Sequence, residues 1–272
     1  MKKRGKRTAR RDAASGPTLI WGINPVTEFL THAPHSLEHI LVLPSFGRKK
    51  RQKALIDLAC NRQVRVETAH DFKRLDMAQG ALHQGVVALA EPVWETAMES
   101  LPSVWGSDVP LLVVCDEISD PGNLGAIIRS SAAFGAHAVI ISQRNSADIN
   151  GTVIKASAGA IVHLHTCMVD NMAKAIETLK EMGIWTAALV PVDSMPVWDA
   201  DMRTPLALVL GAEGKGLRPL VMRRCDIRLH IPQSIRVESL NVAAACTAAL
   251  YETWRQRRKD AASPAEYSGP LK

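Results

Sequence analysis

The sequence predicts an α/β protein in which a mostly parallel β-sheet, covered by helices on both faces, follows a smaller α/β unit. Continuous apolar runs such as 111–115 and 206–210 are typical of strands that are buried on both faces of a sheet. Segments with helical periodicity alternate with these runs, as they do in successive βα units. Hydrophobic residues make up 47% of the 272 residues, which is enough for packed cores and excludes a disordered chain.

The smaller unit is expected at residues 18–92. Pro25 suits the first turn of a helix, where its missing N–H group has no intrahelical partner to lose. Val26, Phe29 and Leu30 then give that helix one apolar face. Apolar or alternating runs predict the strands. In order, the predicted elements are a helix after Gly22, a strand at 39–43, a helix at 54–60, and strands at 64–67 and 85–90.

The larger unit is expected at residues 111–258, after a linker at 93–110 that is rich in proline and serine. Tryptophans in the linker indicate that it packs against a neighbouring element. Gly135 and Gly183 each end a helical segment, as glycine often does, and Ser239 is a candidate N-cap. Strands are predicted at 111–115, 138–142, 184–189, 206–210 and 227–231, and helices at 123–134, 172–182 and 239–258.

The formal net charge of +6 comes from a basic arm at the N-terminus, residues 1–17. Residues 1–12 hold seven cations and one acid, so the other 260 residues are neutral in sum. A loose tail is expected at 259–272. Two cation-rich segments, 48–53 and 255–259, lie outside the arm. Each is typical of a solvated helix face, or of a nucleic-acid contact if the neighbouring chemistry supports one.

Cysteine and histidine usage argues against disulfides and metal. The five cysteines form no C-x-x-C pair, and the nine histidines form no H-E-x-x-H motif. We therefore expect no metal site, and a reducing cytoplasm as the natural compartment. His163 and His165 alternate in an apolar segment that we interpret as a strand, where a structural role is expected. No apolar run of about 18 residues exists, so no membrane helix is predicted.

Loops rich in glycine, proline and polar residues follow three of the apolar strands. Because the carboxyl ends of parallel strands meet at one edge of a sheet, these loops predict a ligand pocket there. The loop after 206–210, GAEGKG, fits neither the dinucleotide-binding glycine pattern nor a Walker A loop. Ser157 does not fit a G-x-S-x-G nucleophile elbow. Nicotinamide, ATP and serine-hydrolase chemistry are therefore disfavoured.

The same three loops carry motifs in a defined order. DPGNLGAIIRSSAAFGAHAVI begins at Asp120, LALVLGAEGKGL at Leu206 and IPQSIRVESLNVAAA at Ile231. These segments resemble the three motifs of the SpoU (TrmH-like) RNA 2′-O-ribose methyltransferases. IWGINPVTEFL, HQGVVALA and KASAGA further resemble the RlmB-like subgroup, which methylates guanosine in bacterial 23S rRNA. The resemblance covers about residues 18–258.

The resemblance implies a knotted (trefoil, SPOUT-type) catalytic unit, a homodimer, S-adenosylmethionine (S-adenosyl-L-methionine) as cofactor, and an RNA-binding N-terminal unit. RNA is the expected partner, with rRNA favoured and tRNA the alternative. The residues that it assigns to the cofactor site are Gly211, Ile231 and Leu240. Those that it assigns to the catalytic and RNA-facing cluster are Asn123, Arg129, Glu213, Ser239 and Asn241.

Two questions stay open at this point. A guanidinium normally stays protonated, so Arg129 is either a base after losing a proton to a neighbour or a clamp for phosphate and developing alkoxide. Glu213 is expected to orient Arg129 or a ribose hydroxyl. Gln233, Ile235 and Ala243 depart from the family pattern of the third motif. They keep open a catalytically silent RNA-binding or ribosome-assembly protein, and a base-methylating enzyme is a third alternative.

Overall fold

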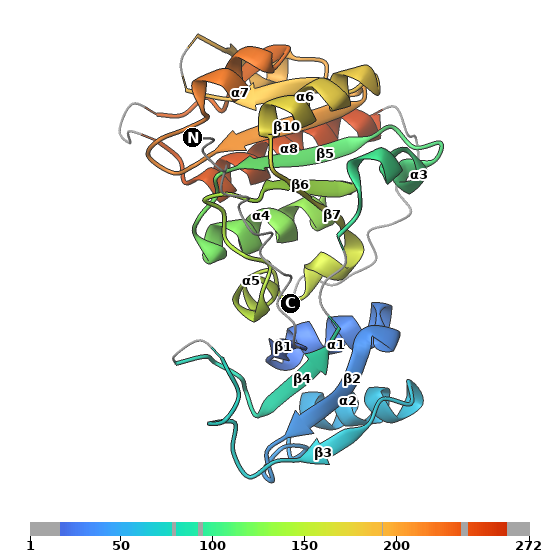
Figure 1. The fold of residues 1–272 in the computed structure, drawn as a ribbon. Coiled ribbons are helices and arrows are strands. Elements are labelled where there is room, and N and C mark those ends of the chain that lie inside the picture. Colours follow the sequence, from blue (N-terminus) through green and yellow to red (C-terminus); the bar gives the residue numbers. More distant parts are fainter. Residues whose placement is uncertain (1–16, 78–79, 92–94, 192, 235–238, 260–272) are drawn as a thin grey trace, which may run out of the picture.

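The computed structural model describes residues 17–77, 80–91, 95–191, 193–234 and 239–259. Within them, two separate β-sheets form, one in each predicted unit (Figure 1). The basic arm up to residue 16, the tail from residue 260 and the departure at Ile235 lie outside the described residues. No helix among the described residues is both long and apolar enough to cross a membrane.

The N-terminal unit is a four-stranded mixed sheet in the order β1-β4-β2-β3. Only β2 and β3 pair in parallel, while β4 is antiparallel to both of its neighbours. The predicted apolar face of the first helix is buried at Val26, Phe29 and Leu30. The elements are β1 (Thr18–Trp21), α1 (Ile23–His32), η1 (Pro34–Ser36), β2 (Leu37–Val42), α2 (Lys50–Asn61), β3 (Val66–Thr68) and β4 (Val86–Ala90).

The larger unit is built on a parallel seven-stranded sheet in the order β7-β6-β5-β10-β8-β11-β9. This confirms the predicted α/β class with a mostly parallel sheet. The strands are β5 (Leu111–Asp116), β6 (Ala138–Ser142), β7 (His165–Val169), β8 (Trp185–Leu189), β9 (Met195–Pro196), β10 (Leu206–Gly211) and β11 (Ile227–His230).

Helices cover both faces of this sheet. Alternate residues of β5 point to opposite faces: Leu111, Val113 and Cys115 pack with α4, α5 and α8, whereas Leu112 and Val114 pack with α6 and α7. Every residue of β5 is buried, which explains its continuous apolar run. The helices are α3 (Pro102–Trp105), α4 (Pro121–Ala133), α5 (Gly151–Ala156), α6 (Met172–Glu181), α7 (Pro219–Arg224) and α8 (Val242–Lys259), with short turns η2 (Met98–Ser100), η3 (Ala160–His163) and η4 (Val197–Asp199).

The linker packs against the larger unit, as its tryptophans indicated. Leu101 is fully buried, and Val104 and Trp105 pack against the same core as α6 and α7. The N–H of Thr96 donates to the carbonyl oxygen of Thr166, which ties the start of the linker to β7. The segment is therefore part of the folded larger unit from residue 95 onward.

Among the differences from prediction, three have clear local reasons. Helix α2 begins at Lys50, earlier than predicted, because its first turn is polar and exposed and carries no apolar signal. Helix α8 begins at Val242, after Asn241 and not after Ser239. The predicted strand placement of His163 is wrong, since His163 ends the 3₁₀ turn η3 and only His165 begins β7.

Candidate active site

The three predicted ligand-binding loops meet at the carboxyl edge of the larger sheet. They follow β5, β10 and β11, which are parallel members of the strand order β5-β10-β8-β11. The segment after β8 ends at the same edge, where the N–H of Val190 donates to the carbonyl oxygen of Leu229. Open parallel sheets bind their ligands at this edge.

Asn123, Glu213 and Asn241 form a continuous hydrogen-bonded chain across this edge. Nδ2 of Asn123 donates to Oε2 of Glu213 at 2.9 Å. Nδ2 of Asn241 donates to Oδ1 of Asn123, also at 2.9 Å. Each of the three motifs thus supplies one member, although the members lie up to 118 residues apart in sequence. The chain holds the amide of Asn123 and the carboxylate of Glu213 in fixed orientations.

The N-termini of α4 and α8 both lie at this edge of the sheet. Asp120 caps α4 by accepting a hydrogen bond from the N–H of Asn123 at 2.7 Å. Asn241 caps α8, because its Oδ1 accepts from the N–H of Ala243 at 2.9 Å. A helix N-terminus carries a partial positive charge that favours anions. The helix ends therefore place partial positive charge beside the carboxylates of Asp120 and Glu213.

Gly211 ends β10 where the following loop folds back onto it. The loop closes with the N–H of Gly216 donating to the carbonyl oxygen of Ala212 at 2.8 Å. A Cβ atom at residue 211 would lie 2.2 Å from backbone atoms of Gly216 and Leu217. Glycine is thus required here by the loop itself, which presents the exposed Glu213 at its tip.

Gly125 of the first motif has a packing role. A Cβ atom there would lie 2.4 Å from Cβ of Ala156 and 2.9 Å from the carbonyl oxygen of Val153. The glycine therefore allows α4 and α5 to approach closely. The motif alone does not show whether a glycine is needed at this position for packing or for contact with a ligand.

Among the described residues, Arg129 and Ser239 make no hydrogen bond to Asn123, Glu213 or Asn241. Arg129 is exposed on α4, and among the described residues its side chain forms no hydrogen bond or ion pair. Ser239 is exposed and precedes α8 by three positions. Within one chain, the structure brings together three of the five residues predicted to be catalytic. The carboxylate of Glu213 contacts Asn123 and not Arg129.

The residues expected to hold the cofactor follow the ends of β10 and β11. Gly211 is buried, Ile231 is half-buried, and Leu240 is 39% exposed. In the described part of the chain, no backbone hydrogen bond joins Ile231 or Leu240 to another segment. Gly211 thus ends a strand, and Ile231 and Leu240 lie in the loops, at the carboxyl edge of the sheet.

An ion pair that the sequence did not predict lies at this edge of the sheet. The Asp116 carboxylate, which is fully buried at the end of β5, accepts hydrogen bonds from Nε and Nη2 of Arg218. These bonds to Asp116 raise the pKa of Arg218. An acid directly after an apolar strand was the available signal, but its partner lies 102 residues away in sequence.

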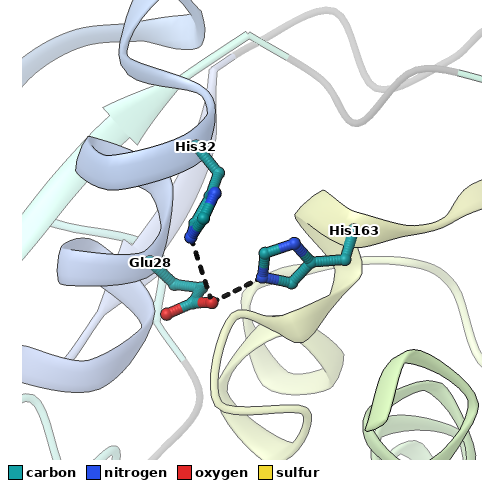
Figure 2. A group of neighbouring side chains, drawn as sticks. All are labelled: Glu28, His32 and His163. Atoms are coloured by element: carbon teal, nitrogen blue, oxygen red, sulfur yellow. Dashed lines mark hydrogen bonds and ion pairs between the residues drawn. The ribbon is translucent and has the colours of Figure 1, made fainter. Parts of the chain in front are cut away.

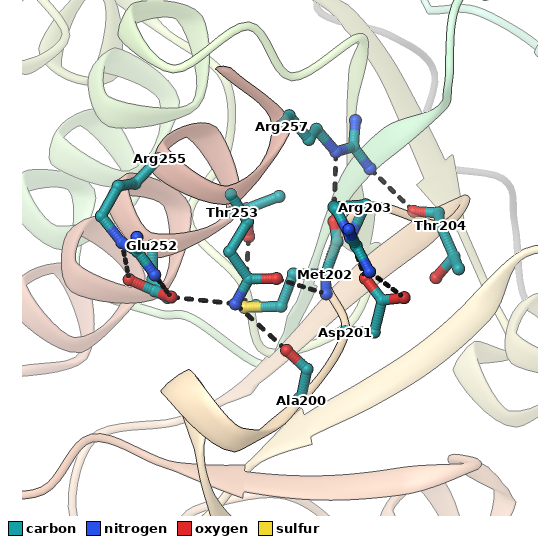
Figure 3. Close-up of polar contacts among 10 residues, drawn as sticks. Ala200, Asp201, Met202, Arg203, Thr204, Glu252, Thr253, Arg255 and Arg257 are labelled. Atoms are coloured by element: carbon teal, nitrogen blue, oxygen red, sulfur yellow. Dashed lines mark hydrogen bonds and ion pairs between the residues drawn. The ribbon is translucent and has the colours of Figure 1, made fainter. Parts of the chain in front are cut away.

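Two arginines of the cation-rich segment 255–259 make contacts within the larger unit (Figure 3). Arg257 donates to the carbonyl oxygens of Val109, Pro110, Met202 and Thr204. Arg255 pairs with Glu252. The expectation that this segment contacts RNA is therefore wrong for Arg257, because folding already uses its donors.

By contrast, the cations of segment 48–53 are exposed around the start of α2. Arg51 donates to Oδ1 of Asn24 at 3.1 Å, and the other cations extend toward solvent. The segment keeps its positive surface after folding. It remains a candidate contact for nucleic acid.

Two family models match the chain. The SpoU rRNA Methylase family matches residues 110–251, and the RNA 2′-O ribose methyltransferase substrate binding model matches residues 19–94. The 23S rRNA (guanosine-2′-O-)-methyltransferase RlmB of Escherichia coli is 35% identical over 241 residues, which cover 88% of this chain and 98% of that protein. An uncharacterized tRNA/rRNA methyltransferase of Synechocystis is 35% identical over 89% of this chain and 63% of its own length.

Solved structures agree with these matches. The SpoU methyltransferase AviRb from Streptomyces viridochromogenes, in complex with AdoMet, superposes with a TM-score of 0.73 and 25% identity, over 90% of this chain and 92% of that one. The comparisons confirm the predicted enzyme class, an RNA 2′-O-ribose methyltransferase, and its cofactor, S-adenosylmethionine. The chain therefore belongs to the SpoU rRNA methylase family.

Proposed function

We propose that this chain methylates the ribose 2′-hydroxyl of a guanosine in 23S rRNA. The observation that carries the proposal is the Asn123–Glu213–Asn241 chain at the carboxyl edge of the sheet, between two helix N-termini. The substrate follows from the RlmB proteins, which act on 23S rRNA guanosine and align with 88% of this chain. tRNA is the alternative substrate.

The arrangement suits the chemistry of ribose methylation. S-adenosylmethionine, when bound, supplies an electrophilic methyl group on a cationic sulfonium. The protein's own residues must hold the ribose and favour loss of its hydroxyl proton. Glu213 accepts a hydrogen bond from that hydroxyl, while Asn123 keeps the carboxylate in place. The N-termini of α4 and α8 stabilise negative charge that develops on the ribose oxygen.

The remaining predicted residues complete this proposal. Gly211, Ile231 and Leu240 bind the cofactor through backbone groups, and Ser239 donates a hydrogen bond near the start of α8. Arg129 acts as a base after losing its proton to a neighbouring phosphate or partner, or as a clamp for phosphate and alkoxide. Its exposed position on α4, with no partner among the described residues, suits a group that engages only when RNA binds.

RNA binding is assigned to the N-terminal unit. Its exposed cations Arg48, Lys49 and Lys50 lie at the start of α2, where the helix dipole is also positive. Positive side chains at this end of a helix are unfavourable by themselves. Their placement is explained if an anionic partner such as the RNA backbone compensates for it.

The knot, the homodimer and the cytoplasmic location belong to the same proposal. A dimer is supported by large apolar side chains that the larger unit leaves exposed, including Tyr251 on α8, which stacks against Trp254. All five cysteines are free thiols, which fits the reducing cytoplasm. Light scattering of the purified chain gives the mass that distinguishes a dimer from a monomer.

Methyl transfer from radiolabelled S-adenosylmethionine to purified 23S rRNA and tRNA tests the proposal. We expect label in 23S rRNA, recovered as 2′-O-methylguanosine, and at least tenfold slower transfer by Glu213→Gln and Arg129→Lys. Arg223→Ala, an exposed arginine on α7, is the control and should retain activity. Near-normal turnover by Arg129→Ala would exclude both roles of Arg129. Absence of cofactor binding by calorimetry would support the catalytically silent alternative.

A further inference from the structure

Two histidines and a glutamate meet where the N-terminal unit contacts the methyltransferase unit (Figure 2). Glu28 and His32 lie one turn apart on α1, and His163 ends η3 of the other unit. Nε2 of His163 lies 2.5 Å from Oε1 of Glu28, and Nε2 of His32 lies 3.8 Å from the same oxygen. One ligand atom from each residue falls within 4.8 Å of the others.

Backbone packing brings these side chains together. Gly159, between α5 and η3, has φ of +89°, and a Cβ atom there would lie 2.8 Å from Cα of Pro25 and from Cβ of Glu28. The rings of His32 and His163 meet edge to face, with their centroids 4.3 Å apart. The cluster is therefore positioned by a close approach of two main-chain segments, and not by flexible side chains alone.

We propose that Glu28, His32 and His163 bind a Zn²⁺ ion that joins the two units. Two imidazole nitrogens and one carboxylate oxygen are a ligand set that zinc prefers, with bonds of about 2.0–2.2 Å. Tetrahedral ligands at that distance lie roughly 3.3 Å apart, and the observed separations of 2.5 and 3.8 Å bracket this value. Small side-chain rotations would bring all three atoms to one ion.

The surroundings suit a cation with one open ligand position. The three side chains are 35% to 45% exposed, so water can reach the fourth position. His32 lies in the last turn of α1, where the partial negative charge of the helix end favours a cation. The ion would fix the RNA-binding unit against the catalytic unit, away from the Asn123–Glu213–Asn241 chain, and would take no part in methyl transfer.

Metal titration of the tag-free, full-length chain tests this site. We expect one Zn²⁺ or Co²⁺ per chain, with the visible absorption bands of tetrahedral Co²⁺. Glu28→Gln and His163→Gln, one in each unit, should each weaken binding at least tenfold. His165→Gln is the matched control: this exposed histidine lies two residues from His163 but contacts Thr96. It should bind metal like the unchanged chain.

Thermal unfolding separates loss of metal from loss of fold. Without metal, His163→Gln can still hydrogen-bond Glu28, so its Tm should stay within a few degrees of the unchanged chain. Excess Zn²⁺ should raise Tm for the unchanged chain and His165→Gln, but not for His163→Gln. His32→Gln, whose only contact to the cluster carboxylate is at 3.8 Å, provides a second variant if His163→Gln unfolds. Absence of stoichiometric binding, or equal binding by the variants, would overturn the proposal.

Discussion

The ion pair between Asp116 and Arg218 contributes to the stability of the larger unit. Asp116 is fully buried, and its partner Arg218 is 41% exposed. The pair lies directly beneath the loops that hold Glu213 and Asn123. A buried carboxylate with a specific cationic partner stabilises the fold only as long as both groups are present, because either charge alone is costly to bury.

We expect Asp116→Asn to lower the free energy of unfolding by about 1–3 kcal/mol. The loss is moderated because the half-exposed Arg218 can turn toward water. Urea unfolding measures it. Asp201→Asn is the matched control, since Asp201 forms an exposed pair with Arg203, and its unfolding midpoint should not change. Equal shifts in both variants would contradict the role assigned to Asp116.

His137 makes the stability of the larger unit depend on pH. Burial lowers the pKa of His137, and the nearby Asp108 opposes this shift only in part. The N–H of Leu111 donates to Nδ1 of the ring at 3.1 Å. Because the folded protein binds this proton less readily than the unfolded chain, the contribution to stability is complete above the usual imidazole pKa of about 6.5.

Acidification through that range should therefore destabilise the fold, by at most about 1.4 kcal/mol per pH unit for this one proton. Chemical unfolding at pH values between 7.5 and 5 should show a shallower loss for His137→Gln than for the unchanged chain. His70→Gln, an exposed histidine in the other unit, is the control and should keep the original slope. An unchanged slope in His137→Gln would refute the assignment.

At the scale of elements, the approach of α4 to α5 positions the first motif. Gly125→Ala would place a methyl group 2.4 Å from Ala156, so we expect a loss of about 1–3 kcal/mol in the free energy of unfolding from overpacking. Gly122→Ala, in the exposed first turn of the same helix, would place its methyl group 3.0 Å from Oδ1 of the capping Asp120, and we expect a smaller loss because that contact lies at the surface. Urea unfolding of both variants distinguishes packing from helix propensity, and equal stability of the two would argue against close packing.

The elements predicted best from sequence are those with a strong apolar signal. Strand β6 has the predicted bounds, and β5 and β10 each extend one residue further. The short elements η2, η3, η4, β9 and α7 were not predicted, because two to six residues carry too little periodicity. The start of α8 was misplaced because Ser239 and Asn241 are both good caps, and only tertiary contacts select Asn241.

The candidate site was predictable in part for the same reason. Asn123, Glu213 and Asn241 follow strand ends that a parallel sheet brings to one edge, so their proximity follows from topology. The Asp116–Arg218 pair and the clamp by Arg257 depend on side-chain pairing over long sequence separations. The contact of Glu28 with His163 depends on how the two units dock. The sequence marks Asp116 as an acid after an apolar strand, but it does not identify the partner in any of these contacts.

Positive charge that could contact RNA is spread over the N-terminal arm and both folded units. The basic arm lies outside the described residues, and the larger unit uses Arg257 and Arg218 in internal contacts. The arm and the start of α2 therefore add positive charge for RNA outside the larger unit, which itself exposes Arg129, Lys215 and Arg223.

Removal of residues 1–12 should weaken RNA binding and reduce its dependence on salt, because seven cations are lost. Affinity for S-adenosylmethionine should not change, since none of the three motifs includes a residue of the arm. Filter binding at low and moderate salt, with calorimetry for the cofactor, measures both. Equal RNA affinity with and without the arm at both salt concentrations would exclude an anchoring role.

Ribose methylation of rRNA by this chain can be measured in cells. The measurement is nucleoside mass spectrometry of 23S rRNA and tRNA from cells with and without the gene. We expect one 2′-O-methylguanosine to disappear from 23S rRNA and to return with the intact gene, but not with Glu213→Gln. Loss of a base methyl group with every ribose methyl group unchanged would contradict the account.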